Sequence, residues 1–204
     1  MRNRSDQKYL DIAESLIRLA TIAEIHEWDN RKHLERIRNY SFVIASSLAL
    51  SQDEAIIISL ACIVHDVGKI MTPTVLLKRP GNFQPEEWTI IEKHTTQGAK
   101  ILESDASYFL QTGSTVALTH HERWDGSGYP QHLKKEKIPL SGRICAVADV
   151  FDALTSQRLY KSVVGEEEAL RLMKKNSGIL FDPTVFKSFE SNFADIRRIK
   201  STFE

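Results

Sequence analysis

The sequence predicts an all-α protein, and three observations favour this fold class. Apolar residues recur at spacings of three and four in several segments, and no segment alternates convincingly with a period of two. A capping box, Ser51-Gln52-Asp53-Glu54, marks the start of one helix. Glycine (9) and proline (6) are sparse, which argues against global disorder. The length of 204 residues suits one domain with a short helical extension.

The first predicted helix covers residues 6–26. Its apolar residues form a narrow stripe of Ile12, Leu16, Leu19 and Ala23, which is typical of a seam between two helices. Two interpretations stay open: the stripe packs on the domain's own core, or it pairs two chains into a homodimer.

Further helices follow along the chain. The third helix should stop near Gly68, and Pro85 suits a first helical position. Residues 72–84 and 123–140 are expected to be loops, because they concentrate proline, glycine or charge. The remaining helices are predicted over residues 31–49, 55–67, 85–103, 106–122, 141–156, 166–176 and 184–193.

Composition limits the partners. Lys plus Arg (27) equals Asp plus Glu (27), so long nucleic acids are poor candidates, whereas a small anionic ligand is compatible. Cys62 and Cys145 lie in apolar runs and are expected to be buried thiols in a reducing cytosol, with a disulfide as the alternative. The chain shows no signal peptide and no membrane span, so we expect a cytoplasmic protein without membrane contact.

Histidine and aspartate recur along the chain at intervals of roughly 26 to 32 residues. One helix and its return take about that length in a bundle, so each group can return to one side of a shared core. A single helical histidine is more often a core or surface residue than a ligand. The pairs His65-Asp66 and His120-His121 follow apolar residues, however, where buried polar groups need a partner. The candidate metal ligands are His33, His65, Asp66, His94, His120, His121 and Asp149.

Imidazole and carboxylate donors together suit transition metals such as Fe, Mn, Zn or Ni, and the lack of thiolate ligands argues against a structural zinc finger. The set exceeds what one tetrahedral ion uses, and a carboxylate such as Asp66 can bridge two ions. Two ions about 3.5–4 Å apart are the usual apparatus of phosphodiester hydrolysis.

Three segments resemble the HD-GYP family of the HD phosphohydrolase superfamily. Residues 65–69 (HDVGK) resemble its HD motif, residues 120–130 (HHERWDGSGYP) its hallmark segment, and residues 148–156 (ADVFDALTS) the segment that follows. The resemblance spans roughly residues 25–190. It implies an HD-domain helical bundle, with residues 1–26 as an N-terminal helical extension, 27–195 as the HD-GYP domain and 196–204 as a C-terminal tail.

The resemblance also implies an activity, the hydrolysis of cyclic di-GMP to pGpG and in some members to GMP. It assigns the seven candidate ligands to two or three divalent ions, with iron or manganese favoured and nickel, cobalt or zinc as alternatives. Some members place a glutamate four residues before the first histidine to support a third metal. Asp29 stands there in this chain, one methylene shorter, so the number of metal ions stays open.

By position, the resemblance assigns catalytic roles to Asp66 and Lys69. Lys69 follows Asp66 by three residues and can share its helix face. The segment Arg158-Leu159-Tyr160-Lys161 lacks the proline of the family's R-P-Y-K segment, and Tyr129 could stack on a guanine or pack on the scaffold. The predicted substrate-binding residues are Lys69, Arg36, Arg143, Lys161 and Tyr129.

Two other functions compete with the phosphodiesterase. One is a cyclic di-GMP receptor or docking partner of diguanylate cyclases with little catalysis, and the intact ligand set favours the enzyme over it. The other is an HD enzyme acting on (p)ppGpp or deoxynucleotides, which the GYP segment disfavours.

Overall fold

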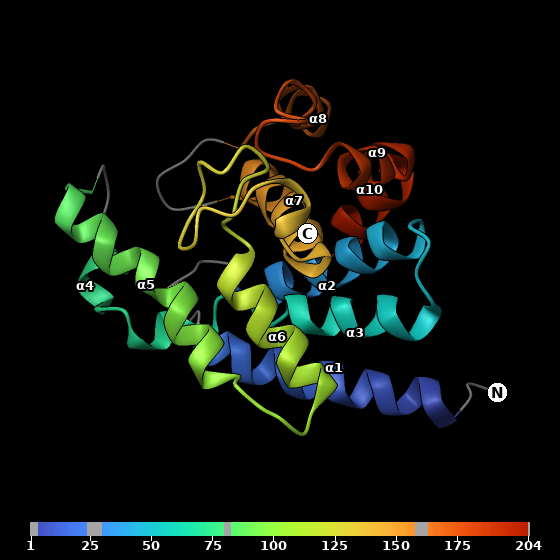
Figure 1. Cartoon of the computed structure of the whole chain (residues 1–204). Coiled ribbons are helices and arrows are strands. Elements are labelled where there is room, and N and C mark those ends of the chain that lie inside the picture. The colour runs from blue at the N-terminus through green and yellow to red at the C-terminus, as the bar shows by residue number, and fades with distance from the viewer. Residues whose placement is uncertain (1–3, 24–29, 80–82, 158–162, 204) are drawn as a thin grey trace.

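The computed structural model describes residues 4–23, 30–79, 83–157 and 163–203, and these residues form helices joined by loops (Figure 1). Within them the β-type pairing is a single isolated bridge between Ser177 and Phe181, so the all-α prediction is confirmed. None of the helices in the described ranges is long and apolar enough to cross a membrane. The elements are α1 (Arg4–Ala23), α2 (Asn30–Ser46), α3 (Gln52–Cys62), η1 (Val67–Met71), α4 (Thr74–Leu77), α5 (Pro85–Ile101), α6 (Tyr108–Thr119), η2 (Lys135–Lys137), α7 (Leu140–Thr155), α8 (Glu166–Lys175), α9 (Pro183–Ser191) and α10 (Phe193–Thr202).

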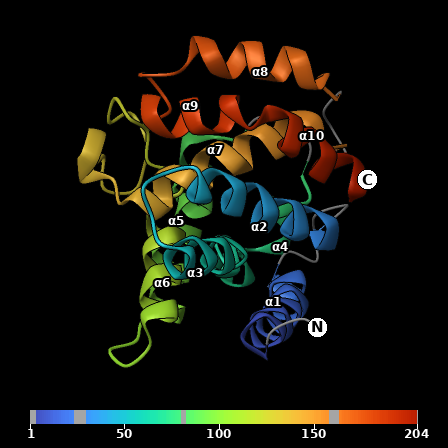
Figure 2. The ribbon, with the colours of Figure 1, turned by 90° about the vertical axis from the view of Figure 1, so that its right-hand side faces the viewer.

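Helices α2 and α7 lie at the centre of the bundle. Helix α2 contacts α1, α3, α7, α9 and α10. Figure 2 shows α8 outermost, then α9 and α10, then α7 and α2, with α3 and α1 on the opposite side. Helices α5 and α6 pack on each other, and α6 also contacts both α3 and α7. A side chain on α2 or α7 therefore has neighbours from both ends of the chain.

The core has two apolar clusters. The larger contains Tyr40, Phe151 and Phe189, with α2, α7 and α9 as its main sources. The smaller lies beneath α1 and includes Ile17 and Ile63. Cys62 and Cys145 are free and buried, as predicted. Because both clusters reach the end of α3, the residues that follow it begin in a buried environment.

The end of α3 differs from the prediction. The capping box at Ser51 is present, but the helix stops at Cys62 instead of continuing to Val67. His65 and Asp66 therefore lie on turns between α3 and η1. A Cβ atom at Gly68 would clash with the backbone of His94, so the chain can cross α5 this closely only with glycine there. The sharp turn brings Asp66 up to α5.

Other boundaries shift by smaller amounts. The predicted loop over residues 72–84 contains the short helix α4, and the predicted helix over 106–122 ends at Thr119, with His120 as its C-cap. The loop over residues 123–140 is irregular as predicted, apart from the short η2. Residues 193–202, most of them assigned to a tail, form α10, whose Ile196 is fully buried. The division into extension, domain and tail stays a prediction.

Helix α1 docks on the domain's own core. It buries Ile17 and Ala20 completely or nearly so, and Leu16 packs at the edge of the same cluster. Of the predicted stripe, Leu19 does not reach this core: it is 65% exposed, and its neighbour in the next turn, Ile22, is 60% exposed. Pairing of two chains through residues 6–26 stays a prediction, and the buried face is no longer available for it.

Candidate metal centre

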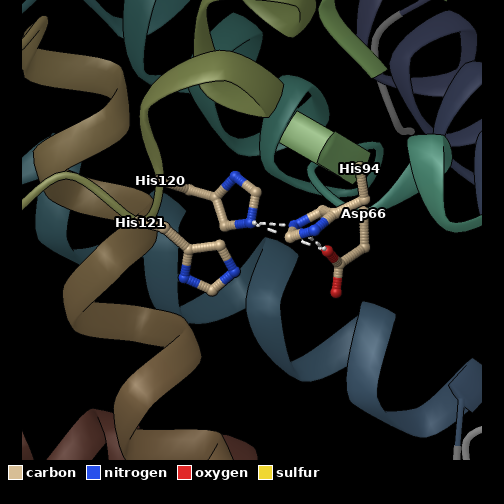
Figure 3. Close-up of side chains that lie close together, drawn as sticks. All are labelled: Asp66, His94, His120 and His121. Atoms are coloured by element: carbon tan, nitrogen blue, oxygen red, sulfur yellow. Dashed lines mark hydrogen bonds and ion pairs between the residues drawn. The ribbon is translucent and has the colours of Figure 1, made fainter. Parts of the chain in front are cut away.

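All seven predicted metal ligands come together at the centre of the molecule. They form two groups, and within each group one ligand atom from every residue lies within 4.8 Å of the others. Ligand atoms that close can share one ion, because metal–nitrogen and metal–oxygen bonds are about 2.0–2.2 Å long. The first group, here named the His94 cluster and drawn in Figure 3, contains Asp66, His94, His120 and His121. The second, named the His33 cluster, contains His33, His65 and Asp149.

Asp66 connects the two clusters. Its Oδ1 lies 3.1 Å from Nε2 of His94 and 3.6 Å from Nε2 of His120. Its Oδ2 lies 3.2 Å from Nε2 of His65 and accepts a hydrogen bond from Nζ of Lys69 at 2.6 Å. Each oxygen thus faces a different cluster, which is the geometry that a bridging carboxylate requires.

Asp66 is ionised at neutral pH. The residue is 6% exposed, and burial alone would raise its pKa. The ammonium group of Lys69 beside it nevertheless holds the pKa of Asp66 well below its usual range. The carboxylate is therefore negative and able to bind cations. The neighbouring positive charge belongs to Lys69, which was predicted to be catalytic.

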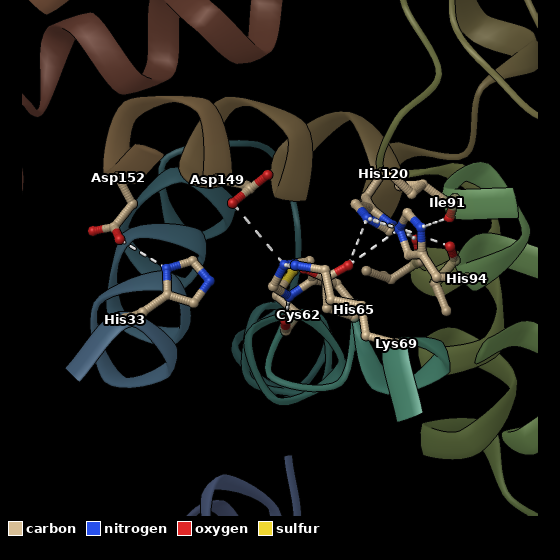
Figure 4. Close-up of polar contacts among 12 residues, drawn as sticks. His33, Cys62, His65, Lys69, Ile91, His94, His120, Asp149 and Asp152 are labelled. Atoms are coloured by element: carbon tan, nitrogen blue, oxygen red, sulfur yellow. Dashed lines mark hydrogen bonds and ion pairs between the residues drawn. The ribbon is translucent and has the colours of Figure 1, made fainter. Parts of the chain in front are cut away.

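Four of the histidines, His33, His65, His94 and His120, present their Nε2 atoms to the centre, because the Nδ1 of each is engaged elsewhere. Nδ1 of His65, His94 and His120 lies 2.9 Å, 2.7 Å and 3.0 Å from a backbone carbonyl oxygen of the preceding turn. Nδ1 of His33 lies 2.7 Å from Oδ2 of Asp152 (Figure 4). Carbonyl and carboxylate oxygens only accept hydrogen bonds, so each of these Nδ1 atoms carries a proton, and in the neutral ring Nε2 carries the lone pair.

The donor set fits a cation at the His94 cluster. Nε2 of His94 and Nε2 of His120 are 3.4 Å apart, and both face Asp66 Oδ1. Among the residues that the structure describes, no group donates a hydrogen bond to this buried oxygen. Three electron-rich atoms that face one another without a proton between them repel, and a metal ion would convert this repulsion into ligation.

Burial keeps two of these histidines neutral. Desolvation lowers the pKa of His120 and lowers the pKa of His121 well below its ordinary value. A neutral imidazole is the form that binds a metal, so both residues are ready to bind near neutral pH without first losing a proton.

The loop after α6 holds His121 in place. The ring of Tyr129 stacks on the imidazole of His121 at 4.7 Å, and the Tyr129 amide donates to the His121 carbonyl at 3.3 Å. The buried carboxylate of Glu122 accepts hydrogen bonds from the amides of Gln131 and Leu133 at 2.7 and 3.0 Å. Of the two roles open for Tyr129, the structure shows the scaffold contact, and stacking on a guanine stays a prediction.

The predicted substrate-binding cations lie in different surroundings. Lys69 lies at the centre, beside Asp66. Arg36 is only 2% exposed and binds Asp152, and its assignment to the substrate stays a prediction. Arg143 binds Asp182 and the Ile138 carbonyl oxygen. It also lines a cavity of about 380 Å³ whose lining includes none of the described metal ligands.

Two predicted residues, Asp29 and Lys161, lie outside the residues that the structure describes, as does the rest of the Arg158–Lys161 segment. The sequence interpretation missed one residue at the site, Asp152. A signal for it was present, because Asp152 follows Asp149 by three residues in an apolar run and so lies one helical turn further along α7.

Known proteins share the sequence pattern and the fold of this chain. The family model described as HD domain matches residues 18–185. A cyclic di-GMP phosphodiesterase of Thermotoga maritima is 43% identical over 88% of this chain and 50% of its own length. The cyclic di-GMP phosphodiesterase response regulator RpfG of Xanthomonas campestris is 40% identical over 93% of this chain and 50% of its own. The chain thus spans about half the length of these curated relatives.

The fold is also found in solved structures. The crystal structure of a cyclic GMP-AMP-specific phosphodiesterase of Vibrio cholerae, V-cGAP3, superposes with a TM-score of 0.71. It is 22% identical, and the match covers 95% of this chain and 51% of that one. At this identity the likeness shows a shared helical fold.

Proposed function

The chain belongs to the HD domain family and to its HD-GYP branch, and we propose that it is a metal-dependent phosphodiesterase that hydrolyses cyclic di-GMP. The observation that carries the proposal is Asp66, whose two oxygens face two separate clusters of imidazole and carboxylate ligands. A pair of ions linked by one carboxylate is the common arrangement for attack on a phosphodiester.

Divalent ions bound at the two clusters would supply water activation near neutral pH and would offset charge on the phosphate oxygens. The chain's own groups have distinct tasks. Asp66 fixes the position of one cluster relative to the other, because its two oxygens face both. Lys69, whose ammonium group lies 2.6 Å from Asp66 Oδ2, is placed to donate a hydrogen bond to a phosphate oxygen next to that carboxylate. The ring of Tyr129 stacks on His121, and the carboxylate of Glu122 binds the loop that borders the site, so both residues hold this loop next to His121.

The metals proposed are iron or manganese, with nickel, cobalt or zinc as alternatives, because imidazole and carboxylate ligands suit all of them. The two clusters support two ions. A third ion would require Asp29, which lies outside the described residues.

The proposed substrate is cyclic di-GMP, with pGpG and then GMP as products. Cyclic GMP-AMP is the competing substrate, because a relative with the same fold is specific for it. Both are small cyclic dinucleotide anions, so the described metal ligands do not choose between them. Docking of diguanylate cyclase domains is a further proposal, for which the relatives' names give no support.

The test is anaerobic purification, metal analysis, and incubation with cyclic di-GMP, 3′3′-cyclic GMP-AMP and linear pGpG, with products separated by chromatography. We expect pGpG or GMP from cyclic di-GMP, and loss of activity in Asp66→Asn. Asp105→Asn is the matched control, because Asp105 is an exposed acid in the α5–α6 connection. Metal-containing protein that binds cyclic di-GMP and leaves it intact would instead identify a receptor.

A further inference from the structure

Asp152 lies directly behind the His33 cluster. It is 1% exposed and sits on α7, one turn beyond Asp149. Its Oδ2 accepts the Nδ1–H of His33 at 2.7 Å and a guanidinium N–H of Arg36 at 3.1 Å. Its Oδ1 accepts the Nε–H of Arg36 at 2.6 Å. Both oxygens are therefore occupied, and the carboxylate cannot rotate without breaking contacts.

The guanidinium group of Arg36 is also fixed by several hydrogen bonds. Arg36 follows His33 by three residues on α2, so the two side chains share one face of that helix. A third contact of its guanidinium goes to the carbonyl oxygen of Phe203, at the end of α10, at 2.9 Å. The orientation of Asp152 thus depends on α2, α7 and the C-terminal helix together.

His33 differs from three other histidines of the site in the partner of its Nδ1. His65, His94 and His120 donate to neutral backbone carbonyls, whereas His33 contacts a carboxylate. An anionic acceptor forms the stronger hydrogen bond, fixes the tautomer and makes the opposite nitrogen a better ligand. The difference falls in the His33 cluster, whose described members are His33, His65 and Asp149.

We propose that Asp152 is a positioning residue for His33, held in place by Arg36, and that together they set the affinity of the His33 cluster for its metal ion. Arg36 therefore acts through the metal centre and does not contact the substrate. The proposal rests on the metal centre of the proposed function, but it makes no use of the substrate.

Asp152→Asn tests the proposal because it replaces one carboxylate oxygen by a donating NH2 group. Arg36 donates to both Asp152 oxygens, and the amide keeps its single acceptor on the shorter of these contacts, with Nε of Arg36 at 2.6 Å, which turns its NH2 towards His33. Nδ1 of His33 must then accept, the proton moves to Nε2, and the lone pair for the metal is lost. We expect about 10–100-fold weaker binding of one of the two ions, the range found for outer partners of metal ligands.

The readout is competition of each bound ion with a chelator in solution, using Mn²⁺ on the full chain. One ion, at the His33 cluster, should weaken, while the ion at the His94 cluster keeps its affinity. Asp182→Asn is the matched control, since Asp182 is also buried and also pairs with an arginine, Arg143 on α7, but has no histidine partner among the described residues. Equal weakening of both ions in Asp152→Asn, or the same weakening in Asp182→Asn, would overturn the proposal in favour of a purely structural ion pair.

A second measurement keeps the proposal testable without metal or activity. Nitrogen NMR of the His33 ring in the metal-free protein should show the Nδ1–H tautomer in the wild type and the Nε2–H tautomer in Asp152→Asn. An unchanged tautomer would refute the proposal even if the enzyme is active. Conversely, failure to cleave any cyclic dinucleotide would refute the proposed function and leave the tautomer result standing.

Discussion

The two metal clusters are supported in different ways. In the His94 cluster, His94 and His120 are oriented by carbonyl oxygens three residues earlier in their own helices, and His121 by the loop that immediately follows it. In the His33 cluster, His33 is oriented by Asp152, which lies 119 residues away in the sequence. His94 and His120 thus rely on local structure, as does His65 of the other cluster, whereas His33 relies on the packing of α2, α7 and α10. This difference predicts how each responds to mutation and to acid.

Asp66→Asn should have the largest effect because Asp66 belongs to both clusters. Loss of a mere outer partner already costs about 10–100-fold, so we expect activity to fall by more than about 100-fold. Metal content should fall at both clusters together. The measurement is turnover of cyclic di-GMP alongside metal analysis, and a variant that loses only one ion would show that the clusters do not share this ligand.

Glu122→Gln should destabilise the loop that supports the His94 cluster. The buried carboxylate accepts two backbone amides, and the neutral amide side chain has only one acceptor oxygen for them. Leaving one buried donor unsatisfied costs about 1–3 kcal/mol in the free energy of unfolding. Urea denaturation measures this, with the exposed Glu136→Gln as control. Equal stability of the two variants would mean that Glu122 does not hold the loop.

Tyr129 should act through its ring. Tyr129→Phe keeps the stacking on His121 and should retain metal affinity, whereas Tyr129→Ala removes a contact worth about 0.5–1.5 kcal/mol. The alanine variant should therefore bind the His94-cluster ion up to about tenfold more weakly, as chelator competition would reveal. Unchanged ion affinity in Tyr129→Ala, with weaker substrate binding, would favour the guanine-stacking role.

In the metal-free protein, His121 and Asp152 should change the free energy of unfolding in two different ranges of acidic pH. The pKa of His121 is lowered by burial, so the unfolded chain takes up protons that the folded chain does not, and stability falls as the pH drops below about 6.5. For Asp152, burial would raise the pKa, but the hydrogen bonds from His33 and Arg36 outweigh it and lower the pKa to about 2. Its contribution is present above pH 3.8 and is lost as the pH falls towards 2.

Urea denaturation at a series of pH values measures both windows. His121→Gln should reduce the slope of stability below pH 6.5, and Asp152→Asn should reduce it only below pH 3.8. A His121→Gln curve parallel to the wild type across the upper window would contradict the assignment.

The sequence allowed the clustering of the candidate ligands to be predicted, because each lies in a segment with a recognisable residue pattern. All seven come together as expected, and the all-α fold with most helix positions is confirmed. The early end of α3 was not predictable from periodicity, since it depends on the close crossing of Gly68 and α5. The contacts of Arg36 were not predictable for a similar reason: whether a side chain is buried depends on distant helices, here α7 and α10.

The most direct test of the shared centre is the number of metal ions bound per chain. Protein saturated with Mn²⁺ under anaerobic conditions, freed of excess metal and analysed by mass spectrometry, should contain at least two ions. Asp66→Asn should lose ions from both clusters, because Asp66 faces both. A wild-type protein that retains a single ion, or none, at saturating Mn²⁺ would contradict the account of two clusters bridged by one carboxylate.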